Sequence, residues 1–206
     1  MALAPQAWLL RGYARELAVT LLADIARVEA GSPLRRLRTR AGPMSVETTN
    51  CGSFGWIADT RGYRYSTQDP LTTRDWPPMP RSFAELARAA ADSCGFADFS
   101  PDACLINCYR PGARMGLHQD RDEEDFSQPI VSVSLGLPAV FRWGGSHRND
   151  PATGHLLQHG DVVVWGGRAR LAFHGILPLK AGTHPQTGAV RYNLTFRRAR
   201  QARDKE

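Results

Sequence analysis

The chain has 206 residues, enough for one domain with a sizeable core, and 42% of them are hydrophobic, which excludes a disordered chain. No apolar run approaches the ~20 residues that a membrane span requires. The 26 basic residues, nearly all of them arginines, exceed the 20 acidic ones and give a net charge of +6. This excess favours a nucleic-acid partner, because arginine pairs with phosphate, although a biased genomic composition would produce the same excess.

The N-terminal sequence MALAPQAWLLRGYARELAV has no basic segment followed by a long apolar one. We therefore expect no signal peptide and a cytoplasmic protein, and we expect a monomer. The cysteines form no C-x-x-C pair, and a chain of this length needs no disulfides, so reduced thiols are expected. The cysteines are Cys51, Cys94, Cys104 and Cys108.

Two helices are predicted in the first half of the chain. In residues 14–30 apolar side chains recur at helical spacing, and a Gly-Ser-Pro sequence ends the pattern. The second helix covers residues 82–95, where Ser82 and Glu85 have the spacing of a capping box. Gly95 suits the left-handed position at the C-terminal end of that helix.

The rest of the chain is predicted to be β-structure and loops. Residues 31–81 are rich in Gly, Pro, Thr and aromatic residues, which indicates short strands and exposed loops, with an irregular loop at the end of the segment. After Pro101, short segments rich in β-branched and aromatic residues are separated by turn residues, which predicts a sandwich or a jelly roll. These segments are ACLINCY, IVSVSL, AVFRW, DVVVW, LAFHGI and VRYNLTF.

A candidate metal site begins with His118-Gln119-Asp120. In extended chain, residues i and i+2 share a face, so this imidazole and this carboxylate converge. A third, distant histidine would complete a triad that suits Fe(II) and leaves metal positions open for a cosubstrate and O2. The motif is short, and a match by chance is common.

The strand VRYNLTFR sharpens this hypothesis. Its polar residues alternate with apolar ones, which is also the pattern of an ordinary strand with one face in water. Two arginines on one face could instead bind a dicarboxylate such as 2-oxoglutarate, because a buried arginine needs an anionic partner and its planar fork binds carboxylates well. The polar face comprises Arg191, Asn193, Thr195 and Arg197.

Five histidines remain as the third ligand. His174 alone lies inside a predicted strand, 17 residues before Arg191, whereas the other four lie in turn-like or polar segments. His155 and His159 have a spacing that binds zinc on a helix, but the turn QHGD beside them argues against that helix. A histidine in a strand is more often a core residue, yet the other motifs favour His174. The remaining candidates are His147 and His184.

Long segments of the chain resemble the bacterial AlkB proteins. These segments are NCYRPGARMGLHQDRDE, PIVSVSLGLPAVFRWGG, HGDVVVWGG, RYNLTFR, and the stretch from TTNCGSFGW to DWPPMPRSF. The resemblance covers about residues 40–198 and implies a mainly β (α+β) fold, a double-stranded β-helix or jelly roll with N-terminal helices. It implies one dioxygenase domain over residues 1–206, with a nucleotide-recognition lid at about 40–80 and a jelly-roll core at about 101–198.

The resemblance also implies the roles of residues around the metal. His118, Asp120 and His174 would bind Fe(II). Arg191 would hold the distal carboxylate of 2-oxoglutarate, and Arg197 would bind the carboxylate beside its keto group. The other residues expected in the cosubstrate pocket are Asn107, Tyr109 and Asn193. Asn107 and Tyr109 share a strand face, which independently suits a joint role.

The lid residues would contact a flipped base. Trp56 would stack on the base opposite His118, and Asp122 would accept a hydrogen bond from its exocyclic amine. Tyr63, Arg121 and Arg148 would be further substrate contacts. The residues themselves leave alternatives open: Trp56 could be a core aromatic, and Asp122 lies in DRDEED, a typical solvated loop.

The activity implied by the resemblance is oxidative demethylation of N-alkylated bases, such as 1-methyladenine and 3-methylcytosine, in single- or double-stranded DNA, with RNA as a second candidate. The reaction would use Fe(II) as cofactor and consume 2-oxoglutarate and O2. It would release formaldehyde, succinate and CO2. Two alternatives remain: a 2-oxoglutarate-dependent hydroxylase of a protein or small molecule, and a non-catalytic nucleic-acid binding module.

Overall fold

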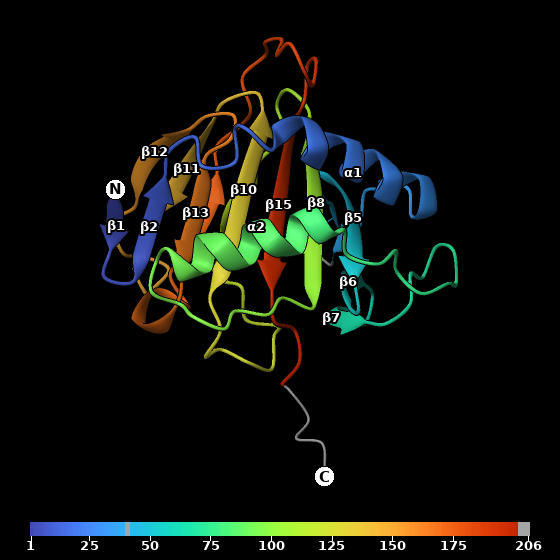
Figure 1. Ribbon diagram of the computed structural model, residues 1–206, viewed down its shortest axis with the longest axis horizontal. Helices are drawn as coiled ribbons and strands as arrows, with labels where there is room; N and C mark the ends of the chain where they lie inside the picture. The colour runs from blue at the N-terminus through green and yellow to red at the C-terminus, as the bar shows by residue number, and fades with distance from the viewer. Residues whose placement is uncertain (40–41, 202–206) are drawn as a thin grey trace.

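Two antiparallel sheets make up most of the protein, and two helices cover one face of the larger sheet (Figure 1). The computed structural model describes residues 1–39 and 42–201. Residues 40–41, at the start of the expected lid, and 202–206, at the end of the expected domain, lie outside the described residues. The larger sheet has the strand order β1-β2-β13-β10-β15-β8-β5. Its strands are β1 (Ala2–Ala4), β2 (Ala7–Leu10), β5 (Glu47–Gly52), β8 (Ala103–Tyr109), β10 (Ile130–Gly136), β13 (Val162–Trp165) and β15 (Arg191–Arg197).

The smaller sheet faces the larger one. Its strand order is β12-β11-β14-β9. The strands are β9 (Met115–His118), β11 (Ala139–Trp143), β12 (Thr153–Leu157) and β14 (His174–Ile176). A buried hydrophobic cluster joins Phe141 and Trp143 of the small sheet to Ile130 and Val163 of the large sheet. This pair of packed sheets confirms the mainly β jelly roll predicted from the sequence.

Two hairpins and a short 3-10 turn complete the β-rich part. The hairpins are β3 (Arg38–Thr39) with β4 (Gly42–Pro43), and β6 (Gly55–Asp59) with β7 (Gly62–Ser66). The turn η1 covers Gly167–Ala169. The predicted strand LAFHGI is only His174–Ile176, because the residues before it continue the turn that follows η1. Strands β1 and β2 were not foreseen, since AWLL is too short for its periodicity to distinguish a strand from a helix.

The helices α1 (Ala18–Gly31) and α2 (Arg81–Asp92) pack their apolar faces onto the large sheet (Figure 1). Leu21 and Phe83, each fully buried, belong to one cluster with Val133 and Phe196 of the sheet. Burying a side chain of this size contributes about 1.5–3 kcal/mol, so the two helices are held mainly by this face. Neither is long and apolar enough to cross a bilayer, among the residues that the structure describes.

The ends of α2 match the sequence prediction at one end only. At the C-terminus, Phe96 N–H donates to Ala91 O and Gly95 adopts φ +82°, which confirms the left-handed glycine. The capping box is wrong: Pro80 is the N-cap, and the Ser82 hydroxyl donates to Asp24 of α1 instead. Asp24 is buried and requires donors, so Ser82 joins the two helices rather than capping one.

Strand β15 lies at the centre of the large sheet and fixes the polar face predicted from VRYNLTFR. It pairs with β10 on one side and with β8 on the other, in continuous antiparallel register. Leu194 and Phe196 point to the helices, and the alternate polar residues point between the two sheets. Each polar residue is less than a tenth exposed, so the alternative of a face in water is wrong.

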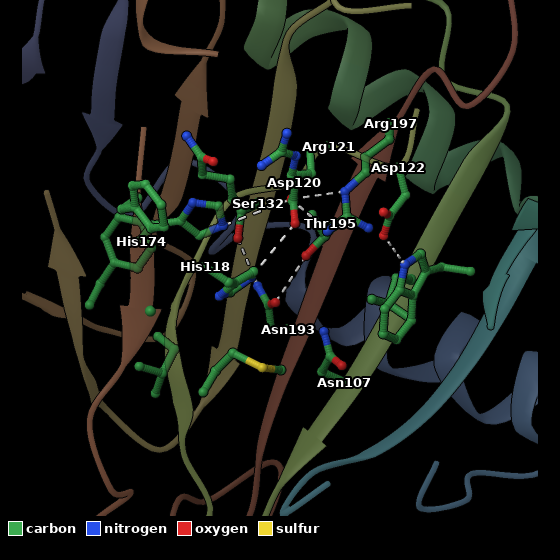
Figure 2. A pocket seen from close by; sticks show the side chains of 18 of the residues that line it. Asn107, His118, Asp120, Arg121, Asp122, Ser132, His174, Asn193, Thr195 and Arg197 are labelled. Carbon is green, nitrogen blue, oxygen red and sulfur yellow. Dashed lines mark hydrogen bonds and ion pairs between the residues drawn. The ribbon is translucent and has the colours of Figure 1, made fainter. Parts of the chain in front are cut away.

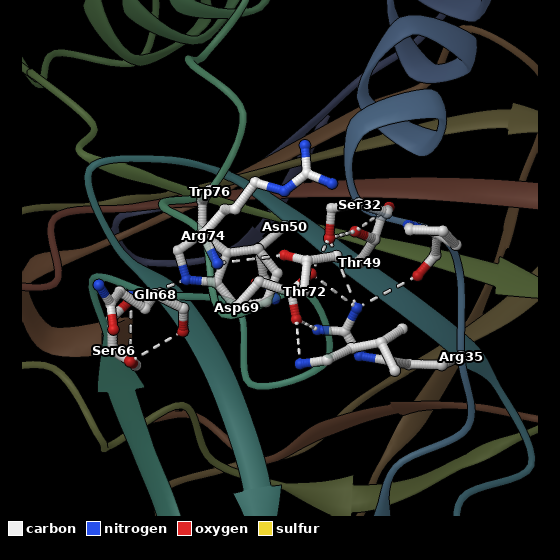
Figure 3. A network of polar contacts seen from close by, with 12 residues as sticks. Ser32, Arg35, Thr49, Asn50, Ser66, Gln68, Asp69, Thr72, Arg74 and Trp76 are labelled. Atoms are coloured by element: carbon white, nitrogen blue, oxygen red, sulfur yellow. Dashed lines mark hydrogen bonds and ion pairs between the residues drawn. The ribbon is translucent and has the colours of Figure 1, made fainter.

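A buried polar network ties the loop after β7 to the end of α1 (Figure 3). Asp69, fully buried, accepts hydrogen bonds from the Ser32 hydroxyl at 2.5 Å and from Arg35 Nη2 at 2.6 Å. Thr49 of β5 donates to Ser32 O at 2.7 Å, which extends the network into the large sheet. The segment expected to be an exposed, irregular loop is therefore irregular but anchored, and it supports the β6–β7 hairpin from one side.

Candidate active site

A cavity of about 440 Å³ lies between the two sheets. One wall consists of polar side chains from β8, β10 and β15, and the other of residues from β9, β11 and β14 (Figure 2). The mouth carries residues of the β6–β7 hairpin and of the loop after β9. Of the thirteen residues proposed from the sequence, the cavity is lined by twelve, and Arg148 is outside the lining.

His118, Asp120 and His174 converge at one end of this cavity. One ligand atom from each lies within 4.8 Å of those from the other two. His118 ends β9 and His174 begins β14, and these residues are direct cross-strand partners. Their rings are 4.4 Å apart between centroids, with Asp120 beside both. Two imidazoles and one carboxylate on one side of a metal suit Fe(II) and leave other positions open.

Both imidazoles are oriented for coordination. His118 Nδ1 is 2.9 Å from Gly116 O, and His174 Nδ1 is 3.0 Å from Ala172 O. A carbonyl oxygen only accepts hydrogen bonds, so each Nδ1 carries a proton and each Nε2 is turned toward Asp120. Burial, together with the neighbouring charge of His118, lowers the pKa of His174 to about 4, so this ligand is neutral at pH 7.

Asp120 is the charged member of the triad, and Arg197 is its partner. Arg197 Nε and Nη2 donate to Asp120 Oδ2 at 2.9 and 2.6 Å. Burial alone would raise the pKa of Asp120, but the charge of Arg197 and the two histidines lowers it well below its usual range. The same carboxylate raises the pKa of Arg197 against the effect of its own burial. Asp120 is therefore an anionic ligand at any physiological pH.

Arg191, at the other end of the polar face, has no carboxylate partner among the residues that the structure describes. Its side chain is 1% exposed, lies 5.0 Å from the Tyr109 ring, and donates through Nη2 to Ser134 Oγ at 2.9 Å. Its Nε and Nη1 have no hydrogen-bond partner within the described chain. Burial lowers the pKa of Arg191, although Tyr109 offsets part of that effect. A buried guanidinium with unused donors indicates a site for an anion.

The residues between the two arginines are uncharged and partly satisfied. Asn193 Nδ2 donates to Ser132 Oγ at 2.8 Å, and Thr195 Oγ1 donates to Asn193 Oδ1 at 3.0 Å (Figure 2). Asn107 Oδ1, on the neighbouring strand, is buried without a partner in the described chain. Asn107 and Asn193 are direct cross-strand partners, so they face the same part of the cavity.

The mouth of the cavity brings Trp56, Tyr63 and Asp122 together. The Trp56 and Tyr63 rings stack with centroids 5.4 Å apart, and Trp56 Nε1 donates to Asp122 Oδ2 at 2.8 Å. Trp56 is half-buried and lines the cavity, with part of its surface packed on a small cluster around Tyr65. It is thus a wall of the cavity as well as a packing residue.

The residues of the acidic loop after β9 differ in their exposure to solvent. Arg121 and Asp122 are exposed and line the cavity mouth, whereas Glu123 is 6% exposed. Arg148 is exposed and its Nη1 donates to Leu117 O at 3.3 Å. The expectation of a solvated loop therefore fits Asp122 but not Glu123.

Sequence reasoning missed Glu123, Arg170 and Tyr65. These three buried polar side chains interact directly behind Asp120. Glu123 was concealed in an acidic run, and Arg170 and Tyr65 are separated from it by about 50 residues or more in sequence. No motif spacing connects them, because the contact depends on the tertiary fold.

The fold and the triad together define an iron- and 2-oxoglutarate-dependent oxygenase, and comparison with known proteins agrees. A family model described as the 2OG-Fe(II) oxygenase superfamily matches residues 7–197. The alpha-ketoglutarate-dependent dioxygenase AlkB of Salmonella typhimurium is 58% identical over 96% of this chain and 92% of its own length. The corresponding AlkB of Escherichia coli is 57% identical over the same shares. The chain therefore belongs to the AlkB family within the 2OG-Fe(II) oxygenase superfamily.

Two solved structures have a fold similar to that of this chain. The structure of OsALKBH1 superimposes with a TM-score of 0.85 at 29% identity, covering 96% of this chain and 99% of the other. A 2OG-Fe(II) oxygenase family protein from Burkholderia pseudomallei has a TM-score of 0.58 at 16% identity over 97% of this chain and 89% of its own, a likeness of fold alone.

The residues present fit the groups that this family uses, Fe(II) and 2-oxoglutarate. The donor set of two imidazoles and a carboxylate suits Fe(II). Arg191 Nε and Nη1 have no hydrogen-bond partner within the described chain, and these free donors favour an anionic ligand in the same cavity.

Replacing any triad residue tests the metal site. We expect His118→Ala, Asp120→Ala and His174→Ala each to lose bound iron and to reduce turnover more than ~100-fold, since changes even around metal ligands cost ~10–100-fold. Iron content after desalting measures the first effect, and circular dichroism checks the fold. His155→Ala on β12 is the matched control and should keep its iron. Retention of iron and turnover in a triad variant would remove that residue from the site.

Replacing Arg191 tests the anion site. Arg191→Ala should raise the 2-oxoglutarate concentration needed for half-maximal turnover and leave oligonucleotide affinity, measured without 2-oxoglutarate, nearly unchanged. Losing a buried charge pair costs about 2–5 kcal/mol. Arg88→Ala, an exposed change on α2, is the matched control. An unchanged 2-oxoglutarate requirement in Arg191→Ala would place the carboxylate anchor elsewhere.

Proposed function

We propose that this protein oxidatively removes alkyl groups from the nitrogens of nucleic-acid bases such as 1-methyladenine and 3-methylcytosine, with DNA as the main substrate and RNA as a second one. One observation carries the proposal. A single cavity contains a metal-binding triad and an unpaired arginine, and its mouth is bordered by stacked aromatic rings and an acidic side chain. The AlkB relatives in both enteric bacteria are named alpha-ketoglutarate-dependent dioxygenases. The mouse ALKBH1, 35% identical over 59% of this chain, is named a nucleic acid dioxygenase.

The inner end of the cavity would hold the reaction partners. In this proposal His118, Asp120 and His174 hold Fe(II), and Arg191 holds the distal carboxylate of 2-oxoglutarate with Tyr109 and Asn193 beside it. Arg197 would bind the carboxylate next to the keto group, with Asn107 lining the same space. Arg197 keeps Asp120 fixed and charged at the same time, which follows from their short contact.

The cavity mouth would hold the base. Trp56 and Tyr63 offer aromatic faces, and Asp122 offers a carboxylate held by the Trp56 indole. 1-Methyladenine and 3-methylcytosine carry a positive charge, so an aromatic face and a carboxylate both favour them. A base within a duplex cannot reach the triad, so the substrate base must be flipped out or single-stranded. Arg121, Arg148 and the net charge of +6 would favour the phosphate backbone.

When bound, Fe(II), 2-oxoglutarate and O2 supply the oxidant that hydroxylates the alkyl carbon, and the adduct releases formaldehyde while 2-oxoglutarate becomes succinate and CO2. The chain's own residues orient the two substrates. The buried polar face of β15 would position the cosubstrate, and the apolar wall of Phe141, Trp165 and Ile176 would shield the His174 side of the triad from water.

The proposal includes the organisation of the chain. The 206 residues would act as one domain, with about 40–80 as the nucleotide-recognition lid and about 101–198 as the jelly-roll core. Strand β5 of that lid pairs with β8, so the lid would move through the β6–β7 hairpin rather than as a whole. The metal triad, Arg191 and the residues of the mouth all come from this chain, so the proposed site would be complete in a monomer. All four cysteines are buried free thiols, which supports the cytoplasm.

Turnover on a defined panel of oligonucleotides tests the activity. The panel contains 1-methyladenine or 3-methylcytosine in single- and double-stranded DNA and in RNA, with unmethylated strands and a proline-containing peptide as comparisons. We expect formaldehyde release in step with repair of the methylated strands, and none from the His174→Ala protein. The proposal would be contradicted if none of the methylated strands released formaldehyde, or if the peptide alone were hydroxylated.

Changing Trp56 tests the base contact. Trp56→Ala should reduce repair by the loss of about 1–3 kcal/mol of base stacking, and should spare the slow decarboxylation of 2-oxoglutarate without substrate. Trp56→Phe keeps an aromatic face and should retain more repair. Thermal midpoint, uncoupled turnover and repair are measured on each variant. Parallel loss of all three would assign Trp56 a packing role, for which truncation costs about 3–5 kcal/mol of stability.

A further inference from the structure

Glu123 is a buried carboxylate behind the triad that no step of the reaction uses directly. It is 6% exposed, and both of its oxygens are engaged. Tyr65 donates its hydroxyl to Oε1 at 2.6 Å, and Arg170 Nη2 donates to Oε2 at 2.9 Å. Arg197 Nε lies 3.3 Å from Oε1. Glu123 thus connects three segments that are far apart in the sequence.

The contact with Tyr65 joins Glu123 to the β6–β7 hairpin, which carries Trp56 and Tyr63. Tyr65 lies on β7 and is the direct cross-strand partner of Trp56 on β6. Trp56 donates to Asp122, and Tyr65 donates to Glu123, the next residue along the chain. The hairpin therefore holds two successive residues of the loop, one at the open mouth and one buried.

The contacts with Arg170 and Arg197 join Glu123 to the metal ligand Asp120 and to the part of the cavity proposed for 2-oxoglutarate. Arg170, 3% exposed, donates through Nη1 to the main-chain oxygen of Asp120 at 2.8 Å. Arg197 donates to Asp120 through both Nε and Nη2, and its Nε also forms an ion pair with Glu123 Oε1 at 3.3 Å. A shift of Glu123 would therefore move both the backbone of Asp120 and the guanidinium of Arg197.

These contacts are confined to a dry region, where hydrogen-bonded charges hold one geometry. Two arginines face two carboxylates there, so the group is balanced in charge. Tyr65 adds an uncharged donor, and its burial raises its pKa well above the usual value, so it remains a donor at physiological pH. In such networks the loss of one donor is transmitted to the others.

We propose that Glu123 is a positioning residue which, through Tyr65 and Arg170, couples the seating of the β6–β7 hairpin on a methylated base to the geometry of Asp120 and Arg197. This inference rests on the proposed function of the site. The coupling is reciprocal by thermodynamic necessity. A bound methylated base raises the affinity of the protein for 2-oxoglutarate, and bound 2-oxoglutarate raises its affinity for the methylated base by the same factor. Cosubstrate bound without a base is held less well, which limits wasteful oxidation.

The test measures binding, not turnover. Calorimetry with Mn(II) in place of iron gives the affinity for 2-oxoglutarate with and without an oligonucleotide containing 1-methyladenine. For the unaltered protein we expect the oligonucleotide to tighten 2-oxoglutarate by at least ~5-fold, the lower range of typical coupling. Tyr65→Phe, which removes only the hydroxyl, should reduce that factor to less than ~2-fold while changing the affinity for 2-oxoglutarate alone much less.

Three further variants separate coupling from packing. Glu123→Gln breaks the same contact from its other end, and Tyr65→Phe combined with it should reduce the factor no further than either change alone. Tyr13→Phe, on an exposed tyrosine before α1, is the matched control and should keep the full factor.

The outcomes are distinct. An equal coupling factor in the unaltered protein and in Tyr65→Phe would overturn the inference, as would the absence of coupling in an unaltered protein that repairs the oligonucleotide. Failure of the unaltered protein to bind or repair any methylated strand would instead overturn the proposed function. If one variant does not fold, the other still measures the same contact.

Discussion

The constraint on which the rest of the site depends is the buried polar face of β15. This strand is hydrogen-bonded on both sides and covered on both faces, so its alternate residues have no choice of direction. Leu194 and Phe196 complete the core under the helices, and the alternation then places Arg191 and Arg197 between the sheets. Two buried guanidinium groups require anions, because an unpaired buried charge costs several kcal/mol.

The two arginines meet this requirement in different ways. Arg197 is compensated by Asp120 and Glu123, whereas in the described part of the chain Arg191 contacts the Ser134 hydroxyl and Tyr109 but no carboxylate. The first arrangement keeps the carboxylate of the metal triad ionised and fixed. The second leaves donors for a guest anion in the same cavity. Strand β15 thus supplies both the arginine that holds the metal-site carboxylate and the arginine of the anion site, which explains why the cavity suits Fe(II) and a dicarboxylate together.

The sequence was sufficient wherever a short-range pattern carried the information. The period of VRYNLTFR predicts the polar face, His118-x-Asp120 predicts two converging ligands, and Gly95 predicts a helix end. Prediction from the sequence failed where the role of a residue or segment depends on contacts with distant parts of the chain. Ser82 has a capping-box spacing but bonds to Asp24 of the other helix, and AWLL gives no sign that β2 completes the large sheet. The role of Glu123 was hidden for the same reason, since its partners come from strand β7 and the turn after β13.

The central claim is that one cavity accepts Fe(II) and 2-oxoglutarate together, bound to each other. Anaerobic titration of the metal-free protein with Fe(II) and then 2-oxoglutarate, followed by visible absorption, tests it most directly. We expect a metal-to-ligand charge-transfer band that appears only when both are present and saturates with 2-oxoglutarate. No band, or the same weak absorption as the two compounds give without protein, would show that the cavity does not bind them together.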